Sequence, residues 1–234
     1  MSASKKIDFV GLVETLGSEE LPPMEGVGRR ERKAVATRLK LFRCALQLFA
    51  ERGFSNITVE DITEAADVGK GTFFNYFESK DHVLSVMAEI QLGKVREALQ
   101  AAEEGKRSIR SVVHDLFAKV SEEPGRSPEL ARAVLAAFLS SSIREALSQN
   151  MLDGRRMAGR ILELGQQRGE IDPRLKAEQM ALQIQQSFMG TMLLWSLSGE
   201  KKLQSFANAS FLHFWRAVAA PDQADGESRR ERER

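Results

Sequence analysis

The sequence has 234 residues, of which 42% are hydrophobic and 29% charged, with a formal net charge of +1 and a single cysteine. This length and composition are typical of a globular protein with a sizeable core, and one cysteine excludes an intrachain disulfide and any CxxC metal or redox motif. The amino-terminal residues contain no long apolar run and are interrupted by Asp8 and Glu14. We therefore expect neither a signal peptide nor a membrane span, and predict a soluble cytoplasmic protein.

Residues 1–28 differ from the rest of the chain. After a short amphipathic piece they run through SEELPPMEGVG, which has the composition of a linker. The next segment, from Gly28 to Lys40, carries six basic residues against one acidic residue. On its own, such a run is most simply the solvated face of a helix.

The following segments predict helices. Apolar residues recur at three- and four-residue steps from Val35 to Phe49, which predicts a helix that ends near Gly53. Thr58, with Asp61 three residues later, predicts the amino-terminal cap of a second helix. DVG interrupts this helix, KGTFFNYF forms a short third helix, and Ser79 caps a long helix to about Ala102.

Later helices are separated by predicted breaks. These breaks fall at Glu104–Gly105, Glu123–Gly125, Asn150–Gly154, Gly169–Pro173 and Gly199. The segments between them have helical length and apolar stripes, and no segment alternates as a strand would. The fold class is therefore predicted to be all-α.

Residues 58–77 match the helix-turn-helix plan, in which two helices are joined by a short turn containing glycine. In that plan the second helix enters the major groove of DNA. The spacing turns Phe73 and Phe77 inward and leaves the polar residues of the third helix outward. Among these, Lys70 suits a phosphate or a guanine, and Asn75 suits an adenine.

The segment from Val35 to Gln91 resembles the DNA-binding domain of the TetR family of bacterial transcriptional regulators. The resemblance rests on FAERGF at the end of the first helix, on TVEDI, on the V-x-K-G-T turn and on YF-x-S-K-D before the long helix. By position, it implies the following DNA contacts: Thr58, Lys70, Gly71, Thr72, Phe74, Asn75, Tyr76 and Lys80. Thr58, Tyr76 and Lys80 match phosphate contacts. Gly69 and Phe74 depart from the family's usual hydroxyl residues, which puts polar contacts there in doubt.

The resemblance implies an all-α protein in which a three-helix DNA-binding domain is joined to a carboxy-terminal regulatory and dimerisation domain. The predicted boundaries are 1–28 for the extension, 29–95 for DNA binding, 96–220 for the regulatory domain and 221–234 for a disordered tail. Beside this DNA-binding domain, the basic run predicts a flexible arm, formed by Arg29, Arg30 and Arg32, that reaches the minor groove or phosphates.

The last two helices are apolar over more than one face, which a monomer would not easily cover. We therefore predict a homodimer that matches a palindromic double-stranded DNA operator. Its predicted interface residues are Phe188, Met192, Trp195, Phe206, Phe211 and Phe214. The resemblance also implies a cavity among the middle helices for a small apolar or aromatic ligand, with these lining residues: Phe117, Leu135, Phe138, Met157, Ile161 and Met189. Ordinary core packing is the alternative for both sets.

The sequence contains no HExxH, GxSxG or complete phosphate-binding loop, and its three histidines lie far apart. We therefore predict no catalytic residue, no metal and no cofactor, and treat Cys44 as buried filler. The leading hypothesis is a repressor released from its operator by a ligand. The alternatives are a DNA-binding protein controlled by a protein partner and, more remotely, a helical adaptor or enzyme without DNA binding. The identity of the ligand, the operator and the direction of regulation stay open.

Overall fold

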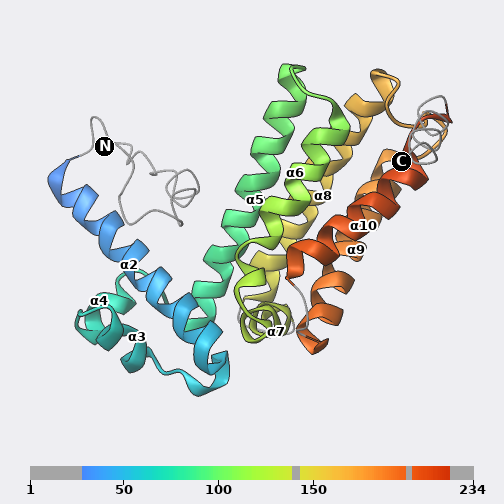
Figure 1. Cartoon of the computed structure of the whole chain (residues 1–234). Coiled ribbons are helices and arrows are strands. Elements are labelled where there is room, and N and C mark those ends of the chain that lie inside the picture. Colours follow the sequence, from blue (N-terminus) through green and yellow to red (C-terminus); the bar gives the residue numbers. More distant parts are fainter. Residues whose placement is uncertain (1–27, 139–142, 199–201, 222–234) are drawn as a thin grey trace.

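The computed structural model describes residues 28–138, 143–198 and 202–221, most of which lie in helices (Figure 1). The helices are α2 (Arg29–Arg52), α3 (Val59–Ala65), α4 (Lys70–Phe74), α5 (Lys80–Glu104), α6 (Ile109–Ser121), α7 (Pro128–Ala137), α8 (Arg144–Gln167), α9 (Ala177–Ser198) and α10 (Leu203–Val218), with short 3-10 turns η2 (Phe54–Asn56) and η3 (Pro124–Arg126). These ranges contain no strand beyond an isolated bridge between Ile171 and Ala219, so the predicted all-α fold is confirmed. The predicted extension and tail lie almost wholly outside them. No helix within them is long and apolar enough to cross a membrane.

The predicted helix ends of the amino-terminal part are confirmed by their hydrogen bonds. The hydroxyl of Thr58 accepts from the backbone N–H of Asp61 at 3.2 Å, and the carboxylate of Asp61 accepts from the N–H of Thr58 at 2.7 Å. Ser79 caps α5 by accepting from the N–H of His82 at 3.2 Å. Each such cap typically stabilises a helix by about 1 kcal/mol. At the other end of α5, Gly105 takes a left-handed conformation with φ 72°.

The break predicted at Asn150–Gly154 is wrong, because α8 runs without interruption from Arg144 to Gln167. The glycines lie inside α8, where the lack of a side chain lets other residues pack closely against the helix. A Cβ at Gly154 would lie 3.6 Å from Leu92 of α5, and a Cβ at Gly165 would lie 2.6 Å from Ile171. Tertiary packing along α8 therefore outweighs the ~1 kcal/mol by which glycine disfavours a helix interior.

The flexible arm predicted for Arg29, Arg30 and Arg32 is corrected by the structure. All three residues lie in the first turns of α2 and are exposed. The helix extends this far because no glycine or proline interrupts it after Gly28, and because its buried stripe begins soon after, at Val35. The basic run is thus the exposed start of a helix.

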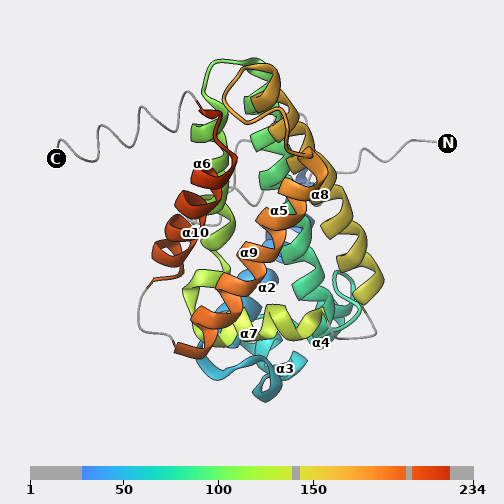
Figure 2. The same cartoon turned by 90° about the vertical axis from the view of Figure 1, so that its right-hand side faces the viewer.

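The molecule has two groups of helices that share α5. In Figure 1, α2, α3 and α4 gather at one end, and α5 leads from them into a bundle with α6, α8, α9 and α10. Figure 2 shows α7 crossing the base of this bundle, where it packs against α2 and α9. The core of the amino-terminal group includes Leu130 and Ala133 of α7 and Leu147 of α8. The domain boundary predicted at residue 95 thus falls inside α5.

Candidate functional site

The helix-turn-helix consists of α3, the turn that follows it and α4, and its inner side is a packed core. Phe73 and Phe77 are fully buried, with ring centroids 5.4 Å apart, and belong to the same core as Ile62. The N–H of Val68 donates to the carbonyl of Thr63 at 3.0 Å, which holds the turn against α3. The predicted inward packing of the two phenylalanines is confirmed.

The outer side of α4 is open to solvent. Lys70, Gly71, Phe74 and Asn75 are exposed, and Thr72 is half-buried. Phe74 has 50% of its surface exposed, although such a large apolar side chain would gain free energy from burial. This face therefore presents a cation, an amide and an apolar ring from a single short helix. Its contacts with DNA bases stay a prediction.

Lys70 is paired in the free protein. Its ammonium contacts the carboxylate of Glu60 on α3, and each of these two side chains is more than half exposed. The hydrogen bond from Lys70 holds the pKa of Glu60 below its usual range. A DNA group that binds this ammonium would have to compete with Glu60. Glu60 is not among the residues predicted from the sequence.

Lys80, predicted to contact a phosphate, has a different environment. Its ammonium donates to the carbonyl oxygens of Phe54 at 2.9 Å and Ile57 at 3.0 Å, and lies 4.4 Å from the centroid of the Phe54 ring. Lys80 therefore secures the turn before α3 to the start of α5. Of the other two predicted phosphate contacts, Thr58 is exposed and Tyr76 is half-buried against the core.

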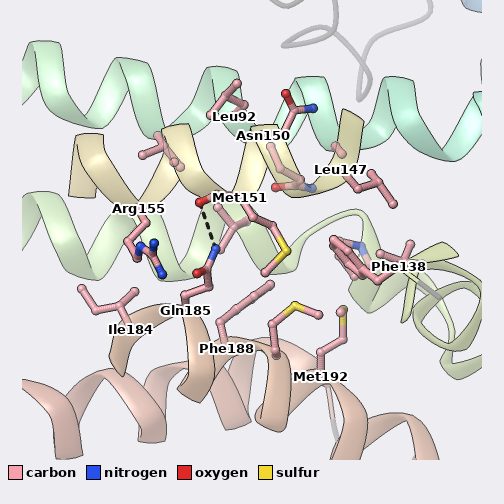
Figure 3. Close-up of a pocket in the computed structure, with 18 of the residues that line it drawn as sticks. Leu92, Phe138, Leu147, Asn150, Met151, Arg155, Ile184, Gln185, Phe188 and Met192 are labelled. Atoms are coloured by element: carbon pink, nitrogen blue, oxygen red, sulfur yellow. Dashed lines mark hydrogen bonds between the residues drawn. The ribbon is translucent and has the colours of Figure 1, made fainter. Parts of the chain in front are cut away.

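A cavity of about 190 Å³ lies inside the bundle, lined by α5, α6, α7, α8 and α9. An engineered apolar cavity of about 150 Å³ can hold a benzene molecule, so this space suits a small ligand. Figure 3 shows side chains of α8 and α9 projecting toward one another across it. Most of its lining is apolar, and its polar side chains are Gln91, Asn150, Arg155 and Gln185.

Three of the six predicted lining residues, Phe117, Phe138 and Met189, do line this cavity. The other three are wrong as lining residues. Ile161 is buried in the core of the bundle, Leu135 packs against a separate small cluster that includes Met192 and Trp195, and Met157 is half-buried elsewhere. The sequence shows an apolar stripe on each helix but does not show which part of a stripe meets the cavity.

The predicted interface residues also need correction. Met192, Trp195, Phe211 and Phe214 each have 7% or less of their surface exposed within one chain, so they cannot supply a contact surface. Phe188 and Met192 line the cavity instead. Phe206 is half-buried. These aromatic and methionine side chains are covered because α6 packs against α10, and α7 and α8 pack against α9.

The large apolar residues that are exposed on α9 and α10 are leucines. Their exposed fractions are 37% for Leu182, 47% for Leu193, 66% for Leu194, 71% for Leu197 and 37% for Leu212. They come from α9 and α10, which lie side by side on the face that Figure 2 turns toward the viewer. An apolar surface does remain on these helices, formed by residues that the sequence analysis did not select.

A sequence profile described as "Bacterial regulatory proteins, tetR family" matches residues 41–87, from the middle of α2 into α5. The transcriptional regulator TcmR of Streptomyces glaucescens is 48% identical over 58 residues, which cover 25% of this chain and 26% of TcmR. The transcriptional repressor DhaR of Mycobacterium sp. strain GP1 is 60% identical over 35 residues, which cover 15% of this chain and 18% of DhaR.

The helix-turn-helix segment of this chain is similar to that of the TetR family. The matched residues span only about a quarter of TcmR and less than a fifth of DhaR. The likeness in fold extends into the carboxy-terminal bundle. SmeT, the repressor of the Stenotrophomonas maltophilia multidrug efflux pump SmeDEF, aligns over 80% of this chain and 93% of its own, with a TM-score of 0.63 at 18% identity.

The residues that the structure describes contain no group of three or more His, Cys, Asp or Glu residues that could hold a metal ion. Cys44 is half-buried in α2, and burial raises the pKa of its thiol. A buried thiol with a raised pKa reacts slowly.

Proposed function

We propose that the protein is a homodimeric transcriptional repressor that binds a palindromic operator through α3 and α4, and that a small ligand in the bundle cavity lowers its affinity for that operator. The observation that carries the proposal is the exposed outer face of α4, which combines Lys70, Phe74 and Asn75 on a packed helix-turn-helix. This face lies within the segment that matches the TetR family. A protein with this role works in the cytoplasm, where the bacterial chromosome lies.

In this proposal α4 enters the major groove. Lys70 and Asn75 contact base edges, and Phe74 contacts a thymine methyl group, since amino, amide and apolar groups suit those partners. Thr58 and Tyr76 contact phosphates, which fix the position of the helix without reading sequence. The exposed arginines at the start of α2 add a contact to the DNA backbone.

The dimer would form through the exposed leucines of α9 and α10. Large contiguous apolar surfaces on a folded chain often mark a protein–protein interface. A twofold axis through this face would relate two copies of α4, as a palindromic operator requires.

The response to a ligand would pass through α5. This helix lines the cavity with Leu84, Met87 and Gln91, and its first residue, Lys80, holds the turn before α3. A ligand that favours one position of α5 would therefore favour one position of the helix-turn-helix. Such coupling between sites is typically about 1–3 kcal/mol. SmeT, which has the same fold, has been solved in a complex with triclosan.

The proposal is tested by footprinting on the DNA next to the gene, with the full-length chain and then with Lys70→Ala and Asn75→Ala variants. We expect a protected palindrome and its loss in both variants. Sedimentation of the protein–DNA complex should give two chains per site. A chain that protects no DNA would overturn the proposal, and a footprint that changes only when another protein is added would favour control by a protein partner.

A further inference from the structure

The cavity contains a single charged side chain among the described residues that line it, Arg155 of α8. The remaining polar lining residues are neutral: Gln91, Asn150 and Gln185. Among the described residues, no aspartate, glutamate or lysine lines the space. A cation in an otherwise apolar cavity is costly unless it is paired, because burial removes part of its hydration.

Arg155 has no such pair. It is half-buried, and it forms no hydrogen bond or ion pair with any residue that the structure describes. The carboxylate closest to it in sequence, Asp153, is bound by Arg156 at 3.2 Å and by Gln149 at 3.1 Å. Gln185, its neighbour in Figure 3, donates its own amide N–H to the carbonyl of Met151 at 3.1 Å.

The carboxylate bound to the lining residue Gln91 is also paired. Glu123 accepts from Lys94 at 2.6 Å and from the amide of Gln91 at 2.9 Å, and its side chain is 7% exposed. This carboxylate therefore neutralises Lys94 and is held against α5. The positive charge of Arg155 is left for a partner that enters the cavity from outside.

We infer that the ligand of this cavity is an amphipathic monoanion, a carboxylic acid with an apolar chain or ring, whose carboxylate pairs with the guanidinium of Arg155. The guanidinium matches a carboxylate in charge and in planar, bidentate geometry. This inference rests on the proposed function, since it names the class of ligand for the same cavity.

The shape of the cavity limits the rest of the ligand. Figure 3 shows Arg155 beside Ile184 and Gln185 toward one end of the lining, and Phe138 and Leu147 toward the other. Leu147 and Arg155 are eight residues apart on α8, which corresponds to about 12 Å along a helix. Since the far end is apolar, a second charge on the ligand would be buried there without a partner. A monocarboxylate with one apolar tail fits both ends.

The inference is tested by isothermal titration calorimetry of the full-length chain with three probes that share one tail: octanoate, octan-1-ol and octylammonium. Each is titrated into the natural chain and into Arg155→Gln. We expect the substitution to weaken octanoate about tenfold or more, since a hydrogen-bonded charge pair is lost, and to change octan-1-ol by less than about twofold. Octylammonium should bind only to the variant.

The matched control is Arg156→Gln. Arg156 is the next residue on α8, but its side chain is 75% exposed and already paired with Asp153. This variant should bind all three probes as the natural chain does. Arg155→Lys keeps the charge but loses the bidentate geometry, so it should bind octanoate more weakly than the natural chain and more tightly than Arg155→Gln. Thermal unfolding of Arg155→Gln should match that of the natural chain, because Arg155 loses no partner.

Three outcomes would overturn the inference: equal weakening of octanoate and octan-1-ol in Arg155→Gln, unchanged binding of octanoate in that variant, or no binding of octanoate to the natural chain. The proposed function is judged separately. Suppose that octan-1-ol binds and abolishes the footprint, and that Arg155→Gln does not change the affinity for octanoate. The inference then fails, but the proposal of a ligand-responsive regulator is supported. If the chain protects no DNA, the proposed function fails whatever the calorimetry gives.

Discussion

The ammonium of Lys80 donates a hydrogen bond to the carbonyl oxygen of Ile57 at 3.0 Å. This bond joins the first residue of α5 to the residue just before the cap of α3. The same ammonium donates a second hydrogen bond to the carbonyl oxygen of Phe54. Because α5 also lines the cavity, the start of the helix-turn-helix is held directly by the helix that a ligand would touch.

Replacing Lys80 by Met should therefore lower the free energy of unfolding. The variant loses two charge-assisted hydrogen bonds to carbonyl oxygens, which together typically amount to about 1–3 kcal/mol. Urea unfolding at neutral pH measures the change. Lys176→Met, at an exposed lysine before α9, is the matched control and should be neutral.

The same variant decides whether Lys80 also touches DNA. If its ammonium stays on the turn, the slope of log affinity against log salt concentration will equal that of the natural chain. A slope smaller by about 0.9 would instead show that Lys80 leaves the two carbonyls and contacts a phosphate in the complex.

Lys70 and Tyr76 should differ in what they contribute to recognition. Lys70→Ala should relax the preference at one base-pair position and cost about 1–3 kcal/mol at the preferred sequence. Tyr76→Phe removes only a hydroxyl from a half-buried ring, so it should weaken all sequences alike. Selection from an operator library at fixed salt separates the two effects. The opposite pattern would mean that the base-reading and phosphate-binding residues have been exchanged.

Glu60→Gln should increase affinity for DNA. The substitution releases Lys70 from its carboxylate partner and removes a negative charge beside the phosphates. Because both side chains are exposed, the pair contributes little, and the expected gain is about two- to fivefold. Glu64→Gln changes the same charge on another exposed residue of α3 and tests whether charge alone explains the result. An equal gain in both variants would show that the pairing with Lys70 is irrelevant.

Replacing Arg29, Arg30 and Arg32 together by Ala should weaken binding to every sequence and flatten the salt dependence. The slope should fall by about 0.9 for each arginine that contacts a phosphate. Alanine favours helix, so the first turns of α2 should persist. The control replaces two exposed arginines of α8, Arg156 and Arg160, by Ala. An unchanged slope in the α2 variant would mean that these arginines only face solvent.

Leu194→Asp combined with Leu197→Asp should produce monomers. These side chains are 66% and 71% exposed in one chain, so a charge there should disturb association and leave the fold intact. Analytical ultracentrifugation and thermal unfolding measure the two effects. Leu152→Asp, at a 39% exposed leucine on α8, is the control. Dimers that persist in the double variant would place the interface elsewhere.

The sequence predicts well what depends on neighbouring residues. The caps at Thr58 and Ser79 and the inward turn of Phe73 and Phe77 follow from local hydrogen bonding and helical spacing, and all are found. Contacts between distant segments were missed. Gly154 predicts a helix break from sequence alone, whereas in the structure Leu92 of α5 lies beside it. Lys80 donates hydrogen bonds to carbonyl oxygens of residues more than 20 positions earlier in the chain.

The same limit applies to the candidate sites. Met192 and Leu193 are adjacent, yet Met192 lines the cavity and Leu193 is exposed. Hydrophobicity cannot separate them, because α9 is apolar over much of its circumference. Only the positions of the neighbouring helices decide which side of α9 is covered.

The packing of α7 against α2 affects how the amino-terminal helices of this chain can be exchanged with those of similar proteins. A gene fusion that transfers residues 29–95 to a different carboxy-terminal half would leave behind Leu130, Ala133 and Leu147, which complete the core of the transferred part. The recipient would have to supply equivalent side chains at the same place. If α4 reads an operator as proposed, its specificity should therefore change more readily by substitutions on α4 than by exchange of whole segments.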